Sequence, residues 1–503
     1  MLNKLVLEKA ALEGLALTYN DVRLRTGYAQ VMPDLVNTES FFSKNVSLKV
    51  PIVSAAMDTV TESKMAIAMA KLGGLGIIHK NFSIDEQAKH VAKVKHHLNG
   101  LIENPFCVSE DESIEEILKK LNNKNFSFRS LPVINSSEKL VGILTGNDFD
   151  FCNDDKQLAK NVMTSAKQML TVPFGTNAKD AYAVMQKTKK KALPVLKENG
   201  SLVGMYVFSD VKRIVNGSSD KYNTDSKGRL RVGAAIGTGK ESLLRAEKLV
   251  EENVDVLVID TAHGDSKPVY DTLKELKEKF PHVDVVVGNV SVGSSAKRLV
   301  EAGADGIKVG QGPGSICTTR IIAGVGRPQV SAIYDCAKAA EEFNVPICAD
   351  GGITSSGDIT IAIAAGASCV MLGNMLAGAD ESPGDTIFLQ GQPWKNYRGM
   401  GSLGAMETNK GSRERYSQAD TGKGQLVPEG IEGVVPYKGK VRDVIFQYVG
   451  GLRRGMGYVG AATVIELKQK GEFDRITNAG LAESHPHGVK ITKDSPNYKG
   501  NMV

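Results

Sequence analysis

Eight short apolar runs, each rich in β-branched residues and ending in glycine or a polar residue, constrain this 503-residue chain more than any other feature. They occupy residues 50–57, 73–79, 230–237, 254–262, 283–290, 304–310, 346–352 and 369–375. Such runs are typical of parallel strands buried on both faces. Segments with helical periodicity, such as Glu241–Asn253 and Gly293–Ala302, separate most of them. Eight alternating units predict a (β/α)₈ barrel of the α/β class, in preference to an open doubly wound sheet.

Composition narrows the functional classes. The net charge of +5 is spread along the whole chain, so nucleic-acid binding is not expected. Six cysteines without a CxxC pair indicate a reducing compartment, and we expect a cytoplasmic protein. Residues 359–379 carry no charge and have about the length of a membrane span. Their glycines and polar residues fit a buried helix followed by a buried strand, so we predict no membrane segment.

One gap between predicted strands is far longer than an ordinary connection, and it contains an internal repeat. Residues 131–133 recur as 193–195, 141–142 recur as 203–204, and Asp148 recurs as Asp210, always 62 residues apart. We therefore expect a catalytic barrel of residues 1–99 and 219–503. The insert, 100–218, would consist of two α+β units, roughly 100–158 and 159–218.

The two units resemble tandem CBS modules, the Bateman regulatory arrangement, which pair to bind adenine or guanine nucleotides. The first unit has the G-x-x-T-x-x-D pattern of these modules at Gly142, Thr145 and Asp148. In the second unit Val207 stands where threonine is expected, which leaves Asp210 as the remaining candidate. The resemblance implies a regulatory nucleotide at Thr145, Asp148 and Asp210, and a purely structural insert is the alternative.

The carboxyl ends of the predicted strands are the expected place for chemistry, because active sites of (β/α)₈ barrels lie there. Asp260 and Asp350 each directly follow apolar residues, a costly position for a charge that binds nothing. A cap of the following helix is the alternative for each carboxylate. Finding two at equivalent positions favours a functional role.

The loop after the sixth run, residues 310–320, carries glycines at alternate positions, and Cys317 lies toward its end. The spacing of these glycines does not match a dinucleotide-binding fingerprint. Residues 233–240 likewise do not match a Walker A loop. Cys317 lies among Gly, Ser and Thr with Arg320 close by, a setting that can stabilise a thiolate. We expect four of the other cysteines to be small buried side chains; they are Cys107, Cys152, Cys336 and Cys348.

Two further segments suggest how a substrate is held. The residues after the seventh and eighth runs, 350–352 and 373–374, are expected to cradle a phosphate through backbone N–H groups. Residues 382–440 are too long for an ordinary connection, and we predict a mobile flap over the active site, with 411–423 its most mobile part.

Several longer runs are similar to the inosine-5′-monophosphate (IMP) dehydrogenase family, most closely to its bacterial members. They are LTYNDV (17–22), PIVSAAMDTV (51–60), GGLGIIHKN (73–81), GSICTTR (314–320), ADGGI (349–353), YRGMGSLGAM (397–406), ERYSQ (414–418), VPEGIEG (427–433) and ESHPH (483–487). The similarity covers nearly the whole length. It implies oxidation of IMP to XMP with reduction of NAD⁺ to NADH, a step of GMP and purine biosynthesis, by a homotetramer.

By this resemblance Cys317 adds to C2 of IMP, hydride leaves to the nicotinamide, and a covalent thioimidate remains for water to cleave. The flap then brings Arg415 and Tyr416 to the water, with Thr319 alongside. An arginine is an unusual general base because its pKa exceeds ~12. The base is therefore either Arg415 or a relay from Thr319 to Glu429.

The resemblance also assigns binding positions. For IMP they are Ser54, Met57, Ser315, Asp350, Gly352, Gly373, Asn374, Tyr397, Gly399, Met400, Gly401 and Glu429. For NAD⁺ they are Asp260, Thr261, Ala262, Asn289, Gly310 and Gly312. For a potassium ion they are Gly312, Gly314 and Cys317, joined by Glu483, Ser484 and His485 of a neighbouring subunit. Ala262 and Asn374 stand where many relatives have serine.

Two rival functions follow from the same residues. GMP reductase shares the barrel, the cysteine loop and the phosphate site, but it needs no hydrolytic flap and generally lacks the paired insert. Arg415-Tyr416 and the repeat therefore both favour the dehydrogenase. A nucleotide-sensing or nucleic-acid-binding module whose barrel has lost catalysis would lack the nucleophile or the flap pair, and this chain has both.

Overall fold

The computed structural model describes residues 4–97, 101–102, 105–123, 130–215, 221–419, 421–493 and 495–498. The chain forms two compact units. The first consists of Met1–Lys95, Lys221–Asp225 and Leu230–Val503, and the second of His96–Asp220 and Ser226–Arg229.

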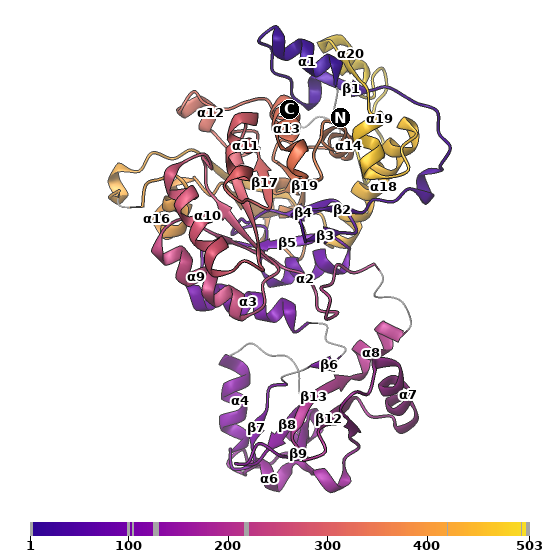
Figure 1. The fold of residues 1–503 in the computed structure, drawn as a ribbon, viewed down its shortest axis with the longest axis vertical. Coiled ribbons are helices and arrows are strands. Elements are labelled where there is room, and N and C mark those ends of the chain that lie inside the picture. The colour runs from indigo at the N-terminus through magenta and orange to yellow at the C-terminus, as the bar shows by residue number, and fades with distance from the viewer. Residues whose placement is uncertain are drawn as a thin grey trace. The chain divides into compact units, whose positions relative to one another are not determined.

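The first unit is a closed barrel of eight parallel strands (Figure 1). In barrel order they are β14 (Gly233–Ile236), β15 (Val256–Asp260), β16 (Asp284–Val290), β17 (Gly306–Val309), β18 (Ile347–Asp350), β19 (Cys369–Leu372), β4 (Ile52–Ser54) and β5 (Leu75–Ile78). Each lies within one of the eight apolar runs, so all eight predicted strands are confirmed. The open-sheet alternative is wrong, because β4 pairs with β19 on one side and β5 on the other.

Helices follow the strands and cover the barrel. They are α2 (Ser63–Lys71), α3 (Ile84–Lys95), α9 (Lys240–Glu251), α10 (Lys267–Lys279), α11 (Gly293–Glu301), α13 (Gln329–Ala340), α14 (Ser356–Ala364) and α18 (Val441–Val459). The predicted helices Glu241–Asn253 and Gly293–Ala302 are α9 and α11 with ends shifted by one or two residues. The uncharged stretch 359–379 contains most of α14 and then β19, as predicted. In the described ranges, no helix is long and apolar enough to cross a membrane.

A hairpin closes the amino-terminal end of the barrel. Its strands are β2 (Ser40–Phe41) and β3 (Ser47–Leu48), and between them Phe42 inserts into the core that fills the barrel. Asp284, the first residue of β16, accepts hydrogen bonds from the Ser43 hydroxyl at 2.6 Å and from the backbone N–H of Asn45 at 2.7 Å. Since this end is plugged, a ligand can enter the barrel only from the carboxyl ends of the strands.

The second unit contains two four-stranded sheets, each with its own apolar core. One sheet has the order β10 (Thr164–Ser165), β9 (Leu140–Thr145), β8 (Ser130–Ile134), β7 (Val108–Ser109). The other has the order β11 (Val172–Pro173), β12 (Ala192–Leu196), β13 (Leu202–Val207), β6 (Leu101–Ile102). Their helices are α4 (Ile114–Asn123), α5 (Gly146–Asp150), α6 (Ala159–Val162), α7 (Ala178–Thr188) and α8 (Phe208–Val215).

The 62-residue repeat falls on equivalent elements of the two sheets. Leu131–Val133 and Leu193–Val195 lie in β8 and β12, while Asp148 and Asp210 lie at the starts of α5 and α8. The expected boundary between the two copies, at 158/159, is wrong for the edge strands of the two sheets. Strand β6 pairs with β13 of the second copy, and β10 pairs with β9 of the first. Each copy thus completes its sheet with an edge strand from outside its own stretch of sequence, because backbone groups at an open edge accept any strand that reaches them.

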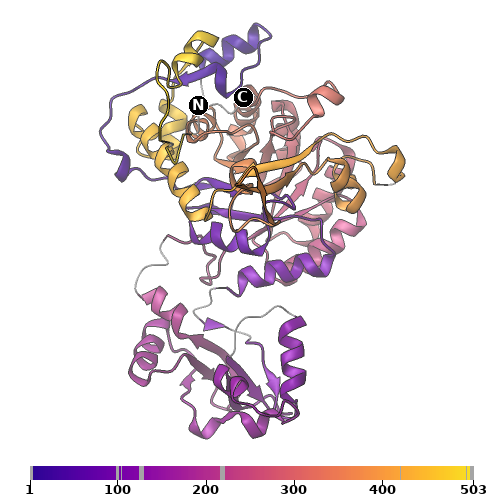
Figure 2. The same ribbon diagram turned by 180° about the vertical axis from the view of Figure 1, so that it is seen from behind.

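The predicted flap region contains regular strands and helices. Strands β20 (Thr386–Leu389), β21 (Gln392–Arg398) and β22 (Glu432–Pro436) form an antiparallel sheet, and the helices α16 (Leu403–Thr408) and α17 (Lys410–Arg415) lie between the last two strands. Figure 2 shows this segment in orange on the barrel unit. The remaining elements are α1 (Leu5–Leu12), β1 (Val22–Leu24), α12 (Thr319–Ile322), α15 (Asn374–Ala377), α19 (Val464–Lys470), β23 (Phe473–Arg475) and α20 (Asn478–Glu483).

The plug yields a test of what stabilises the barrel. Phe42 is 0% exposed whereas its neighbour Phe41 is 48% exposed. We expect Phe42→Ala to lower the free energy of unfolding by about 3 to 5 kcal/mol, because it removes buried contacts and leaves a cavity. Phe41→Ala, the matched control, should change it by about 0.5 kcal/mol. Denaturant unfolding followed by circular dichroism measures both, and equal losses would contradict the role of the plug.

Candidate active site

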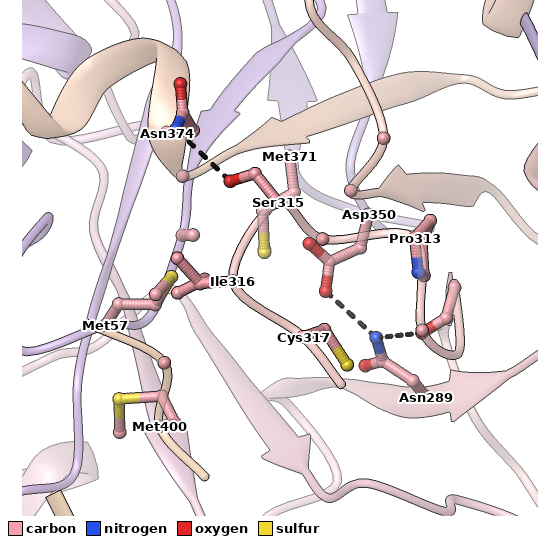
Figure 3. A pocket seen from close by; sticks show the side chains of 18 of the residues that line it. Met57, Asn289, Pro313, Ser315, Ile316, Cys317, Asp350, Met371, Asn374 and Met400 are labelled. Atoms are coloured by element: carbon pink, nitrogen blue, oxygen red, sulfur yellow. Dashed lines mark hydrogen bonds between the residues drawn. The ribbon is translucent and has the colours of Figure 1, made fainter. Parts of the chain in front are cut away.

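A cavity of about 300 Å³ lies at the carboxyl ends of the barrel strands. Its walls come from the ends of β15 to β19, from the loop 310–317 and from the flap segment. In the view of Figure 3, Cys317 lies between Asp350 and Asn289 on one side and Met57 and Met400 on the other. The cavity is therefore the point where the predicted nucleophile, the strand-end carboxylates and the flap meet.

Backbone hydrogen bonds hold the loop that carries Cys317. The N–H of Cys317 donates to the carbonyl of Gly314 at 3.0 Å, and the N–H of Thr318 donates to the carbonyl of Glu429 at 3.0 Å. The Cys317 thiol lies 3.1 Å from the Thr319 hydroxyl. Glycine is required at Gly310, since a Cβ there would lie 2.0 Å from the carbonyl oxygen of Asp350. The loop thus brings a thiol, a hydroxyl and the segment of Glu429 into one wall.

A polar cradle without cations adjoins this loop. Gly351 and Gly352 have φ of +95° and +80°, the left-handed region that glycine adopts without strain. The amide of Asn374 donates to the Ser315 hydroxyl at 3.2 Å. Burial raises the pKa of Tyr397, so its hydroxyl is neutral at physiological pH and can donate a hydrogen bond. Such a set of hydroxyls and backbone N–H groups suits a phosphate.

A buried lysine joins the two strand-end carboxylates. Lys308 of β17 is 1% exposed, and its Nζ lies 2.8 Å from Oδ1 of Asp260 and 2.7 Å from Oδ2 of Asp350. The amide of Asn289 also donates to Asp350 at 3.0 Å, and to the carbonyl of Gly310 at 2.6 Å (Figure 3). The alternative of helix capping is wrong for both carboxylates, because Ser266 and Ser355 occupy the N-caps of the helices that follow.

The flap reaches the cavity through Arg415 and Tyr416. The guanidinium of Arg415 forms an ion pair with Asp260, and its carbonyl accepts the N–H of Ala262 at 2.9 Å. The ring of Tyr416 lies against Gly401, where a Cβ would come within 2.5 Å of it. Burial lowers the pKa of Arg415 and raises that of Tyr416, because desolvation disfavours the charged form of each.

Polar residues of the barrel hold the flap helix α17. Asn81 donates to Asp58 at 2.9 Å and to the Ser412 hydroxyl at 3.0 Å. Lys80 is 4% exposed and lies 3.9 Å from Glu414. Desolvation lowers the pKa of Lys80 to about 8. Sequence reasoning missed Lys80 and Lys308, although a lysine inside a buried apolar run was a signal for the second of these.

Most predicted site residues lie together. The cavity is lined by Met57, Asp260, Ala262, Asn289, Gly310, Gly312, Gly314, Ser315, Cys317, Thr319, Asp350, Gly352, Gly373, Asn374, Tyr397, Gly399, Met400, Arg415, Tyr416 and Glu429. The other wall residues include Lys308, Gln311, Ile316, Thr354 and Met371.

Other predicted residues lie outside this wall. Ser54 is buried and its hydroxyl accepts a hydrogen bond from Thr61, while the hydroxyl of Thr261 donates to the carbonyl of Gly288. Gly401 lies behind the ring of Tyr416. Glu483 ends α20, with Ser484 and His485 directly after it, and none of the three lines the cavity. Thr145, Asp148 and Asp210 belong to the second unit.

The six cysteines are all free. Cys336 and Cys348 are buried, as expected. Cys107 and Cys152 are half-buried, so the expectation of full burial is wrong for them. Each lies in the small second unit, where fewer atoms surround a side chain near the edge of the core.

The carbonyls predicted to bind a cation lie in the loop that carries Cys317. Within the described residues, no group of three or more His, Cys, Asp or Glu side chains could hold a metal ion. The carbonyls of Gly312, Gly314 and Cys317 belong to the cavity loop, and Gly312 has φ of +81°. Neutral carbonyls suit a weakly hydrated monovalent cation better than zinc.

Comparisons with known proteins agree over nearly the whole chain. Residues 16–487 match the family described as IMP dehydrogenase / GMP reductase domain. The chain is 49% identical over 495 residues to an inosine-5′-monophosphate dehydrogenase of Aquifex aeolicus, covering 98% of this chain and 99% of that one. It is 49% identical over 488 residues to the corresponding dehydrogenase of Staphylococcus aureus, covering 96% and 98%.

Solved structures of GMP reductase from Trypanosoma brucei are also similar. A cysteine-to-alanine variant in complex with guanosine 5′-monophosphate gives a TM-score of 0.87 at 40% identity, covering 96% of this chain and 100% of that one. A complex with guanosine 5′-triphosphate gives a TM-score of 0.77 at 36% identity, covering 94% and 100%. An alignment that omitted residues 100–218 would cover only about three quarters of this chain. The similarity to these reductases therefore extends into the insert, so the insert by itself does not exclude GMP reductase.

The hold of Asn81 on the flap is testable. We expect Asn81→Ala to speed hydrogen exchange of the α17 amides about tenfold, because it removes hydrogen bonds that together contribute about 1 to 1.5 kcal/mol. Lys410→Ala is the matched control on the same helix, since it removes exposed ion pairs of Lys410, with Glu241 and with Glu414, that contribute little. Hydrogen exchange followed by mass spectrometry measures both. Equal acceleration in the two variants would exclude a specific role for Asn81.

Proposed function

This chain belongs to the IMP dehydrogenase / GMP reductase family, and from that membership we propose how its residues oxidise IMP to XMP. It is an IMP dehydrogenase, an oxidoreductase of guanine nucleotide biosynthesis that uses NAD⁺ as hydride acceptor. The observation that carries the proposed mechanism is the shared cavity of Cys317, Thr319 and the flap pair Arg415-Tyr416.

Cys317 is proposed as the nucleophile. Its thiolate adds to C2 of IMP, the hydrogen at C2 leaves with its electron pair to the cofactor, and a thioimidate joins C2 to Sγ. Its position supports the role, because the thiol lines the cavity and lies 3.1 Å from the Thr319 hydroxyl. Water then adds to C2, the C–S bond breaks, and XMP is released with the thiol restored.

The cradle is proposed to hold the phosphate of IMP. Ser315, Gly352, Gly373, Asn374 and Tyr397 would bind it, and Asp350 would accept hydrogen bonds from the ribose diol. The purine would then lie between the phosphate site and Cys317, among Met57, Gly399 and Met400. Ser54 and Gly401 could act only by supporting this wall, since neither lines the cavity.

NAD⁺ and the flap are proposed to use the same place in turn. Asp260, Ala262, Asn289, Gly310 and Gly312 would hold the cofactor, whose chemistry is to accept the hydride. Arg415 contacts Asp260 and Ala262, which supports alternation because one carboxylate cannot serve both partners at once. Thr261 would support this wall from behind.

The base for the hydrolytic step is proposed to be either Arg415 or the pair Thr319 and Glu429. Burial lowers the pKa of Arg415, which favours the first, whereas its ion pair with Asp260 favours the charged guanidinium. Thr319 and Glu429 both line the cavity and their segments share a backbone hydrogen bond, which supports a relay.

Three further features are proposed. Carbonyls of Gly312, Gly314 and Cys317 would bind K⁺ together with Glu483, Ser484 and His485 of a neighbouring subunit in a homotetramer. The second unit, as paired CBS modules, would bind a purine nucleotide near Thr145, Asp148 and Asp210. In this structure Thr145 and Asp148 bond to each other at 2.7 Å and cap α5, which also fits the structural alternative. A cytoplasmic location stays a prediction.

The mechanism is tested by separating its two chemical steps. We expect Arg415→Ala to release about one equivalent of NADH per active site in a rapid burst and then to turn over very slowly, because hydride transfer precedes the step that needs the flap. Cys317→Ser, the matched comparison, should bind IMP but give no burst, because a hydroxyl is far less ionised than a thiol. Stopped-flow absorbance measures both. A burst from Cys317→Ser, or none from Arg415→Ala, would contradict the assigned order.

The cation proposal is tested by exchange of salts at constant ionic strength. We expect the rate of NADH formation to fall sharply when K⁺ is replaced by Na⁺ or Li⁺, because smaller and more strongly hydrated ions fit a carbonyl cage poorly. Steady-state rates in the three chlorides measure the effect. Equal rates would remove the cation role from Gly312 and Gly314.

A further inference from the structure

The cluster of Asp260, Lys308 and Asp350 has a charge that depends on the flap. Two carboxylates and one ammonium carry a net charge of −1, and Arg415 brings the sum to zero where it pairs with Asp260. Lys308 and Asp260 are 1% and 3% exposed. Bulk water therefore screens these charges weakly, and a change of one unit has a large effect on what binds beside them.

The surroundings of the cluster do not cancel this charge. Asn289 is neutral and bonds to Asp350, and Glu429, the third carboxylate of the cavity wall, adds negative charge near Tyr416. Among the described residues that line the cavity, Lys308 and Arg415 are the lysines and arginines. With the flap away, the cavity wall therefore has more negative than positive side chains.

Hydride transfer fixes where the cofactor must place its own charge. The nicotinamide ring has to reach the carbon bonded to Cys317, and the cluster lines that same cavity. The oxidised ring is a cation, and it becomes neutral when it receives the hydride. Before the transfer a bound cofactor can thus neutralise the cluster, and after it the cluster regains its charge of −1.

We propose that Lys308 is a positioning residue that holds this cluster at a charge of −1, so that the oxidised nicotinamide and the guanidinium of Arg415 compete as its counter-cations. Loss of the ring charge on hydride transfer then weakens the hold on the reduced cofactor and favours Arg415 in its place. Without Lys308 the cluster would hold either cation too tightly, and without one carboxylate it would hold neither.

This inference rests on the proposed function and concerns the order of its steps. It is tested by binding rather than turnover, in the double variant Cys317→Ser, Arg415→Ala saturated with IMP, where neither chemistry nor the flap competes. The readout is the ratio of the dissociation constants of NADH and NAD⁺, measured at one fixed pH. We expect NAD⁺ to bind about tenfold more tightly than NADH.

Changes of charge should move this ratio in opposite directions. Lys308→Met in the same background should raise the preference for NAD⁺ about tenfold further, and Asp260→Asn should bring the ratio close to one. Lys308→Arg should restore the parental ratio. The matched control is Lys277→Met, which removes the ion pair of Lys277 with Asp305, a residue that precedes β17 and lies outside the cavity wall.

Lys308→Met removes a buried partner and can prevent folding. Lys308→Met combined with Asp350→Asn keeps the charge at −1 and should retain the parental ratio, while Asp260→Asn alone still tests the charge. A ratio that keeps its parental value in Asp260→Asn or in folded Lys308→Met, or that moves equally in Lys277→Met, overturns the inference. Failure of the proposed function is a separate result: the unsubstituted protein would form no NADH from IMP and NAD⁺.

Discussion

Closure of the barrel is the constraint on which every other feature of the site depends. Strand β4, near the start of the chain, pairs with β19, more than three hundred residues later in sequence, and with β5 on its other side. Because all eight strands are parallel, closure brings their carboxyl ends to one rim. Asp260, Asn289, Lys308 and Asp350 meet there although they come from four different strands or strand ends. The hairpin that carries Phe42 plugs the other end, so the rim is where a ligand can enter.

The rim becomes a reaction site through two contrasting kinds of wall. The phosphate cradle is neutral, built from hydroxyls and from glycines that leave backbone N–H groups accessible. The other kind contains the buried charges Asp260, Lys308 and Asp350, which compensate one another only in part. Isolated buried charges are costly, so a partly compensated cluster persists where something else binds it. In this structure Arg415 of the flap is that partner, and its carbonyl also binds the backbone at Ala262.

The flap is held by the barrel as well as by its own fold. Its sheet β20–β21–β22 anchors both ends of the segment that carries α16 and α17. That segment contributes Arg415, Tyr416 and Glu429 to the cavity wall. Asn81 and Lys80 follow β5 and contact α17 through a hydrogen bond to Ser412 and a charge pair with Glu414. A segment held by a few polar contacts can leave at low cost, which a lid that alternates with a cofactor requires.

Local sequence patterns were enough to predict the eight strands, the internal repeat, the cysteine loop and the strand-end carboxylates. These features repeat at short and regular spacings, and burial dictates their composition. The resemblance to a known family then identified the flap pair and most of the residues that line the cavity.

Only the tertiary structure decided what depends on residues far apart in the chain. The sequence shows Lys308 as a lysine within an apolar strand, β17. Its partners Asp260 and Asp350 lie on β15 and β18, which local sequence does not reveal. Likewise, the exchange of edge strands β6 and β10 depends on hydrogen bonds between segments that share no sequence signal. Burial of Ser54 and Gly401 behind the wall depends on neighbours such as Thr61 and Tyr416. Periodicity records which face of an element is buried, whereas the identity of a contact across the core is determined by how the elements pack.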